Sequence, residues 1–272
     1  MEGLSREELL YDPRAERSKQ IRAQRERKMR KRRRFRRLVL LALVAIVFFY
    51  FVSDLSKVRS LSVKGNYFYS DEEIFELAGV SYDTRYLLKP AFLIESSLKS
   101  GSLIESVSVQ KDFSGVIRIE VQEKLVVGYL VKDDEYYLLT SEGKEIKVSD
   151  QQISAAKRYP LLSGFDDEQL SALAAAFDAA KDQIKADVLM RISEIIPYET
   201  SFNTDMMRVI MRDGNTLYGS YDSVGVLQIY ENVLTKLKGN NVCLYMDEEN
   251  GAMSKISCSE FSSSNDEDED KK

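Results

Sequence analysis

The feature that most constrains this chain is an apolar stretch without a charged residue, Leu38 to Val52, that follows a strongly basic segment. As a helix its fifteen residues would span about 22 Å, less than the ~30 Å hydrocarbon core of a bilayer. Phe35 and Leu55 extend the apolar surface, and Arg36 and Arg37 can reach the lipid headgroups. We therefore expect one transmembrane helix here.

Two other structures are compatible with so short a stretch, namely the core helix of a soluble protein and a cleaved signal peptide. The bulky aromatic residues from Phe48 to Phe51 stand where small residues should precede a cleavage site. They suit the aromatic belt of a membrane surface instead. A basic leader of 37 residues also argues against a signal peptide. These points favour a permanent anchor over residues 38–55.

Charge is divided unevenly between the two sides of the anchor. Residues 1–37 contain 15 Lys or Arg and six acidic residues, a net charge of +9, whereas the remaining residues carry 24 bases and 38 acids, a net charge of −14. Because positive charge stays on the cytoplasmic side, we expect a cytoplasmic amino terminus and extracytoplasmic domains after the span. The leader itself, residues 1–37, is expected to be disordered or only partly helical.

The basic run from Arg30 to Arg37 also resembles a nucleic-acid-binding or nuclear-targeting patch. Its position directly beside the span favours a role in topology and in contact with anionic lipid. We therefore expect no specific nucleic-acid partner.

Composition excludes several kinds of active site. The chain has no His and two Cys, so it can form neither a Ser-His-Asp triad nor a zinc site of four thiolates or of histidines. Two Ser-x-x-Lys sequences, Ser141 to Lys144 and Ser154 to Lys157, have the spacing of a serine nucleophile and a lysine base, but the first lies in a predicted hairpin turn and the second lacks companion motifs. We expect no enzymatic activity, cofactor or metal; a membrane-tethered cell-wall hydrolase or peptidase is the alternative.

Residues 56–124 have the pattern of a small α/β module in which two helices cover one face of three strands. The signals follow the order strand, helix, helix, strand, strand: an alternating strand Val58–Val63 with the turn Gly65-Asn66, a capping box of Ser70 and Glu73 with a stop at Gly79, a helix from Pro90 to Gly101, and strands around Val107–Val109 and Ile117–Val121 joined by the turn Asp112–Gly115.

These residues resemble the FtsQ/DivIB family of bacterial cell-division proteins, in which a POTRA domain follows the membrane span. The family pattern hydrophobic-x-hydrophobic-x-Gly-Asn matches Leu61, Val63, Gly65 and Asn66, and a strand that ends in Val-x-Glu-Lys matches Val121 to Lys124. The turn at residues 112–115 departs from the family, because many members have Arg and Pro there. The resemblance covers roughly residues 36–258.

Residues 125–260 are similar to the β domain of that family, a mixed, strand-rich domain with two helices, so the predicted fold class is α+β. The expected strands are Leu125–Val131, Tyr136–Leu139, Lys144–Val148, Val188–Ile196, Met207–Met211, Thr216–Tyr221, Val242–Met246 and Ala252–Cys258, and the expected helices are Leu170–Ile184, capped by Asp166 or Asp167, and Leu227–Leu237, ended by Gly239. Residues 261–272 are expected to form a disordered acidic tail.

Both cysteines lie in the last predicted hairpin. If the chain turns between Asn250 and Gly251, Cys243 opposes Cys258 directly, and Tyr245 opposes Ile256 on the same face. Opposed side chains in antiparallel strands lie about 4.5 to 5.5 Å apart, which permits a disulfide in an oxidising exterior. Two half-buried free thiols are the alternative, and the sequence does not decide between them.

The last strand is also the candidate binding site, because an open sheet edge can accept a strand from another protein. The residues expected to contribute are Tyr245, Ala252, Met253, Ser254, Lys255 and Ile256. A covered or self-protected edge is the alternative. The resemblance implies that this end of the β domain binds the small FtsL/DivIC- and FtsB-like division proteins, with the septal wall synthase as a further partner. It implies a noncatalytic scaffold in the cell membrane at the division septum, which controls septal peptidoglycan synthesis.

Overall fold

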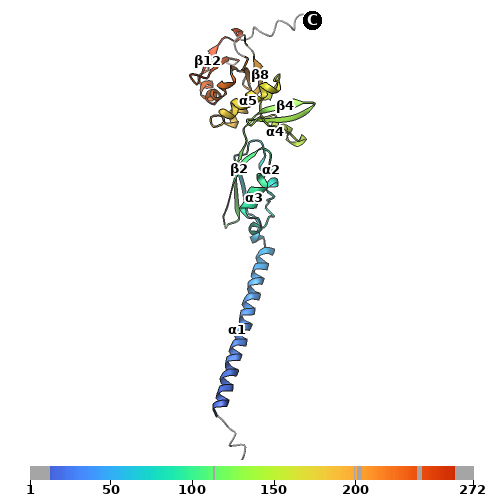
Figure 1. Ribbon diagram of the computed structural model, residues 1–272, viewed down its shortest axis with the longest axis vertical. Helices are drawn as coiled ribbons and strands as arrows, with labels where there is room; N and C mark the ends of the chain where they lie inside the picture. Colours follow the sequence, from blue (N-terminus) through green and yellow to red (C-terminus); the bar gives the residue numbers. More distant parts are fainter. Residues whose placement is uncertain (1–12, 113, 199, 201–203, 238–240, 261–272) are drawn as a thin grey trace, which may run out of the picture.

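The computed structural model describes residues 13–112, 114–198, 200, 204–237 and 241–260, and it arranges them in a line (Figure 1). A long helix stands at one end, a module with a three-stranded sheet follows, and a domain with a nine-stranded sheet forms the other end. The predicted acidic tail and the first twelve residues of the leader lie outside the described residues. The α+β class is confirmed.

Helix α1 runs without interruption from Pro13 to Val52, so the expectation of disorder is wrong for the leader from Pro13 onward. The segment has no Gly and only one Pro, at the first helical position, and it is rich in Arg, Lys, Gln, Glu and Ala, which favour helix. Among the described residues, one segment is long and apolar enough to cross a membrane, Lys31–Val52, and none of it is buried. A soluble core helix is thereby excluded.

The spanning helix ends three residues earlier than the sequence predicts. Its last residue is Val52, and a 3-10 turn, η2, Asp54–Ser56, follows in place of a further helical turn. The hydroxyls of Ser53 and Ser56 donate to the backbone carbonyls of Tyr50 and Phe51, at 2.9 and 3.4 Å. These bonds satisfy carbonyl groups that the end of a helix leaves unpaired.

The predicted order of the membrane-proximal module is confirmed. It consists of β1 (Ser60–Lys64), α2 (Asp71–Ala78), a 3-10 turn η3 (Tyr86–Leu88), α3 (Ala91–Leu98), β2 (Ile104–Asp112) and β3 (Val116–Glu123). The sheet order is β1-β3-β2, with β1 parallel and β2 antiparallel to β3. The apolar sides of the helices, with Ile74, Ile94 and Leu98, share one buried cluster with Ile117 and Ile119 of the sheet.

The caps of α2 explain why this part was predictable. Ser70 accepts a hydrogen bond from the Glu73 backbone N–H at 3.2 Å, and the Glu73 carboxylate accepts one from the Ser70 N–H at 2.8 Å. Gly79 ends the helix with φ of 60°, in the left-handed region where a residue without Cβ costs least. The two hydrogen bonds and the glycine stop all lie within one short segment, so the spacing of residues in the sequence is enough to predict them.

The outer domain is built on a mixed sheet in the order β12-β11-β10-β9-β8-β7-β4-β5-β6. Its elements in chain order are β4 (Val126–Lys132), β5 (Glu135–Thr140), β6 (Glu145–Lys147), η4 (Asp150–Gln152), α4 (Ile153–Ala156), β7 (Leu161–Leu162), α5 (Asp167–Ala179), α6 (Ala186–Leu189), β8 (Ile192–Tyr198), β9 (Met206–Met211), β10 (Thr216–Ser220), η5 (Tyr221–Ile229), α7 (Tyr230–Leu234), β11 (Cys243–Asp247), β12 (Ala252–Ile256) and η6 (Cys258–Glu260). A core cluster includes Leu173 and Phe177 of α5, Val209 of β9 and Leu244 of β11.

Three predicted elements of this domain were wrong in kind or extent. Helix α6 occupies the start of the predicted strand Val188–Ile196, and α5 ends at Ala179, short of Ile184. The predicted helix Leu227–Leu237 is a 3-10 segment, η5, followed by the short α7. Val224, Leu227 and Tyr230 are all fully buried, and their spacing of three suits a 3-10 helix, in which every third residue faces the same way.

The module and the outer domain are joined without a linker, since only Lys124 and Leu125 separate β3 from β4. Glu123, the last residue of β3, accepts hydrogen bonds from the backbone N–H groups of Tyr67, Phe68 and Tyr69, at 3.1, 2.7 and 3.2 Å. Burial raises the pKa of Glu123, and these three donors oppose that shift. The carboxylate thus fixes the segment between β1 and α2.

The same segment is held from the outer domain. The Arg158 guanidinium, just after α4, donates to the carbonyl oxygens of Tyr67 and Phe68 at 2.7 and 2.9 Å. Gln152 donates to the Glu73 carboxylate at 2.8 Å. Tyr159 is 2% exposed and belongs to the buried cluster of the inner module. We call the contacts of residues 67–69 with Glu123 and Arg158 the junction clamp.

Replacing Glu123 by Ala should lower the free energy of unfolding by about 1 to 3 kcal/mol, because buried N–H groups lose their acceptor. The matched control is Glu120→Ala, an exposed residue on the same strand, which should change the stability by less than about 0.5 kcal/mol. Urea unfolding of both variants measures the difference. Equal losses would contradict the role of the Glu123 carboxylate.

Candidate partner-binding edge of the outer domain

Strand β12 lies at one end of the nine-stranded sheet, so the predicted edge position is confirmed for residues 252–256. It pairs on one side with β11 in antiparallel register. Among the described residues no strand pairs with its other side. That side offers backbone N–H and C=O groups in a regular row, the feature that strand addition requires.

The predicted register of the last hairpin is wrong by two residues. Cys243 is opposite Ile256 and not Cys258, and Tyr245 is opposite Ser254 and not Ile256. The closing pair is Asp247 and Ala252, which leaves a four-residue loop where a two-residue turn at Asn250-Gly251 was expected.

The Asp247 carboxylate explains this longer loop. It accepts hydrogen bonds from the backbone N–H groups of Glu249 and Asn250, at 3.0 and 3.2 Å, and from the Asn250 side chain at 2.6 Å. These bonds, that of the Asn250 side chain first, hold the pKa of Asp247 below its ordinary value. Gly251 completes the loop with φ of 58°.

The six predicted binding residues lie together on this hairpin but face different ways. Met253 packs against the core of the domain, opposite the buried Met246. Ser254 and Lys255 are exposed, whereas Ala252, Ile256 and Tyr245 are half-buried. The Met253 side chain therefore attaches β12 to the core. Ser254 and Lys255 remain accessible on the same strand.

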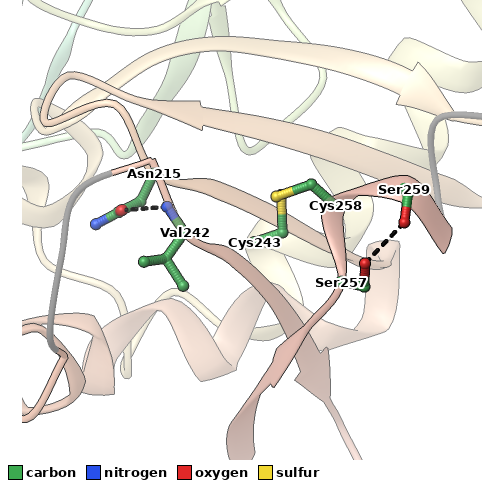
Figure 2. Close-up of a disulfide and its surroundings, with 6 residues drawn as sticks. All are labelled: Asn215, Val242, Cys243, Ser257, Cys258 and Ser259. Atoms are coloured by element: carbon green, nitrogen blue, oxygen red, sulfur yellow. Dashed lines mark hydrogen bonds between the residues drawn. A yellow bond between two sulfur atoms is a disulfide. The ribbon is translucent and has the colours of Figure 1, made fainter.

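A disulfide joins Cys243, at the start of β11, to Cys258, directly after β12 (Figure 2). The Cα atoms are 5.2 Å apart. The structure therefore contains the disulfide and not two free thiols, although Cys243 and Cys258 are not directly opposite each other in the hairpin. Cys258 reaches Cys243 because the chain leaves the strand at Ile256 and enters η6. The bond ties the free end of the edge strand to its neighbour.

The start of β11 is fixed by a buried polar network. The side-chain oxygen of Asn215 accepts from the Val242 backbone N–H at 3.0 Å (Figure 2). The side-chain amide of Asn215 donates to the Tyr230 hydroxyl at 2.8 Å. Tyr230 in turn donates to the Asp213 carboxylate at 2.7 Å. Burial raises the pKa of Tyr230, so its hydroxyl stays protonated and can donate. The Cys243 end of β11 is thus held by contacts that do not involve the edge strand.

The opposite end of the sheet differs from this edge. Strand β6 has three residues, Glu145 to Lys147, and its two charged side chains pair with Lys132 and Glu135. Short strands with charged residues are a common way to prevent pairing at an exposed edge. By comparison β12 has five residues with one charge. Of the two ends, β12 is the one suited to accept a strand.

The sequence reasoning missed a row of side chains that reaches the edge across the sheet. Register places Ser254 beside Tyr245, Tyr245 beside Tyr218 and Tyr218 beside Arg208. The Arg208 Nε is buried and has no hydrogen-bond partner among the described residues. Alternation within each strand could have placed Arg208 and Tyr218 on one face. Their neighbourhood with Tyr245 depends on the parallel pairing of β10 with β11, which the sequence pattern does not reveal.

The two Ser-x-x-Lys sequences do not bring a lysine amine to a serine hydroxyl. Ser141 donates to Asp178 at 3.3 Å, and the Lys144 amine bonds to Glu142 at 2.8 Å. In the second sequence the Lys157 amine lies over the Tyr136 ring, 5.0 Å from its centroid. The described residues also contain no group of three or more Cys, Asp or Glu side chains placed to hold a metal ion.

An unburied apolar helix, followed by a strand-helix-helix-strand-strand module and a strand-rich mixed domain, defines a class of membrane-anchored proteins with a POTRA module next to the span. Residues 56–124 match the family model "POTRA domain, FtsQ-type", and residues 128–248 match "Cell division protein FtsQ/DivIB, C-terminal". Together the two models cover most of the chain, which belongs to the FtsQ/DivIB family.

Individual relatives agree with this assignment. The cell division protein DivIB of Bacillus anthracis is 31% identical over 166 residues, which are 61% of this chain and 60% of that protein. DivIB of Bacillus subtilis is 25% identical over 194 residues, 70% of this chain and 71% of that protein. The chain matches about three fifths of the length of the first such relatives. The solved extracytoplasmic domain of Geobacillus stearothermophilus DivIB is 21% identical, with a TM-score of 0.33, over 43% of this chain and 95% of that one.

Reduction of the Cys243–Cys258 bond should lower the free energy of unfolding by about 3 kcal/mol, because a closed loop of this size restricts the unfolded chain. Urea unfolding with and without reductant measures the loss. The double variant Cys243→Ala, Cys258→Ala is the control and should not respond to reductant. Two thiols that react in the denatured, unreduced protein would disprove the bridge.

Proposed function

We propose that this protein is a noncatalytic, bitopic scaffold of the division machinery, which binds partner proteins at the β12 edge outside the membrane. The observation that carries the proposal is the contrast between the two ends of the nine-stranded sheet, one short and charged and the other longer and accessible. Strand addition there would give affinity through backbone hydrogen bonds and specificity through neighbouring side chains.

A permanent anchor is supported by how α1 ends. The Arg85 guanidinium donates to the Ser53 carbonyl at 2.8 Å and to the Ser56 hydroxyl at 2.7 Å. These contacts attach the residues directly after α1 to the POTRA module, and cleavage of a signal peptide beyond Ser56 would remove both acceptors. The charge division supports a cytoplasmic leader and extracytoplasmic domains, with the basic half of α1 in contact with anionic lipid.

The partners proposed are the extracytoplasmic segments of FtsL/DivIC- and FtsB-like division proteins, with the septal wall synthase as a further member of the assembly. Lys255 is exposed on β12 and is the one charged residue of that strand. An acidic group on the partner strand would pair with Lys255 and fix the register of the added strand. No cofactor or metal takes part in this mechanism.

The functional proposal is tested by isolating the tagged full chain from dividing cells and identifying what it retains. A scaffold should retain bitopic division proteins, and the tagged chain should localise at midcell. A membrane-tethered hydrolase or peptidase would instead release soluble products from purified peptidoglycan. Product release without retained division proteins would overturn the scaffold.

Proline substitutions test the edge itself. Backbone N–H groups of consecutive strand residues point to opposite sides, so one of Met253 and Ser254 donates toward β11 and the other toward the open side. We expect one of Met253→Pro and Ser254→Pro to weaken partner binding with little loss of stability, and the other to destabilise the hairpin as well. Affinity and urea unfolding are measured together for each folded variant.

The matched controls are Met253→Ala and Ser254→Ala, which keep both backbone N–H groups. Ser254→Ala should retain partner binding, and Met253→Ala should lose stability because its side chain packs on the core. Unchanged affinity in both proline variants would refute strand addition at β12.

A further inference from the structure

The 3-10 turn η3 is held against the outer end of the spanning helix. The Arg85 guanidinium binds Ser53 and Ser56, and the Val58 backbone N–H donates to the Thr84 carbonyl at 3.0 Å. Lys57 and Arg85 also form an isolated antiparallel bridge. Since Ser53 directly follows the last residue of α1 and Arg85 directly precedes η3, η3 lies level with the end of the membrane span.

A lysine fixes the orientation of η3. The Lys111 amine donates to the carbonyl oxygens of Tyr86 and Lys89, at 2.6 and 2.5 Å, and lies 4.0 Å from the centroid of the Tyr86 ring. Tyr86 is thereby buried, whereas Leu87 and Leu88 point outward and are 53% and 65% exposed. Loose packing does not explain the exposure of the two leucines, because the Lys111 amine holds the backbone carbonyls of Tyr86 and Lys89 on either side of them.

Other apolar side chains in the neighbouring segments are exposed as well. We define the juxtamembrane patch as Leu55 of η2, Tyr82 of the loop before η3, Leu87 and Leu88 of η3, and Phe92 and Leu93 of the first turn of α3. The exposed residues are polar farther along, at Ser96 near the end of α3 and at Lys99 and Ser100 directly after it. Elsewhere in the described part of the module the exposed large apolar side chains are Tyr67 and Leu77, at 44% and 36%. Apolar exposure is therefore concentrated in the segments around η3, and a patch of this kind marks an interaction site.

The span defines what surrounds this patch. The uncharged residues Leu38–Val52 are about 22 Å long as a helix, less than the ~30 Å hydrocarbon core, so the outer boundary of the core falls at Val52 or beyond it. In Figure 1 the POTRA module stands directly on this end of α1, with the outer domain farther away. Apolar side chains at the level of the end of α1 would meet lipid before they could meet a soluble partner.

We propose that the juxtamembrane patch inserts into the headgroup and upper acyl region of the outer leaflet, a second membrane contact beside α1. The inference rests on the membrane anchor but not on partner binding at β12. Apolar groups on a polar surface commonly enter this region to a depth of about 5 to 10 Å. A second contact point, together with Arg85 bound to Ser53, would fix the tilt of the POTRA module relative to the bilayer.

The test uses the absence of Trp from the chain, which makes any introduced Trp a single probe. The variants Leu88→Trp and Phe92→Trp place it in the patch, and Val131→Trp is the control, because Val131 is 48% exposed on β4 of the outer domain. The full chain is reconstituted into phosphatidylcholine and phosphatidylglycerol vesicles with or without brominated acyl chains. We expect blue-shifted emission and quenching by brominated lipid for both patch variants, and neither effect for the control.

Each contrary result has a separate meaning. Variants that float with the vesicles but are not quenched overturn the lipid contact and leave the anchor intact. A blue shift that grows with the protein-to-lipid ratio, without quenching, identifies a second copy of the chain as the occupant and also overturns it. Failure of the full chain to float overturns the anchor and this contact together, while partner retention in cells reports on the scaffold independently.

Discussion

The junction clamp is the interaction on which the arrangement of the whole molecule depends. A carboxylate at the end of β3 and a guanidinium after α4 hold the same three-residue segment, one by its N–H groups and the other by its carbonyls. The inner and outer sheets have separate strands but are linked through this segment and through the buried Tyr159. Without such a clamp, two domains joined at a single point would be free to reorient.

The clamp matters for the proposed function because the two ends of the molecule would then have different tasks. The membrane end is defined by α1 and by the charged contacts of Arg85 and Lys111, while the proposed binding edge lies in the domain farthest from α1 (Figure 1). Within that domain, the disulfide and the Asn215 network hold the two ends of the terminal hairpin. Hydrogen bonds and a disulfide thus hold the chain both at the junction of the two domains and at the open edge of the sheet.

Local signals predicted the inner module well, since the capping residues of α2 act within a few positions of each other. Prediction failed where distant groups decide. Asp247 closes a longer loop than the Asn250-Gly251 pair suggests, and this shifts the register of β12. As a result Cys243 and Cys258 are not the directly opposite pair that the sequence had led us to expect. The roles of Glu123 and Arg158 rest on contacts across 54 or more positions, which local sequence patterns do not reveal. The β12 edge was predictable because it follows from chain order.

The absence of a linker has a geometric consequence. A scaffold with a flexible connection could collect partners at any height above the bilayer, whereas a continuous rod presents its docking strand at one distance. Only a partner whose own extracytoplasmic segment extends to that distance could pair with it, so stiffness itself would select among membrane proteins that share similar strand sequences. The length of the POTRA module would then act as a ruler, and lengthening or shortening it would change which proteins can assemble.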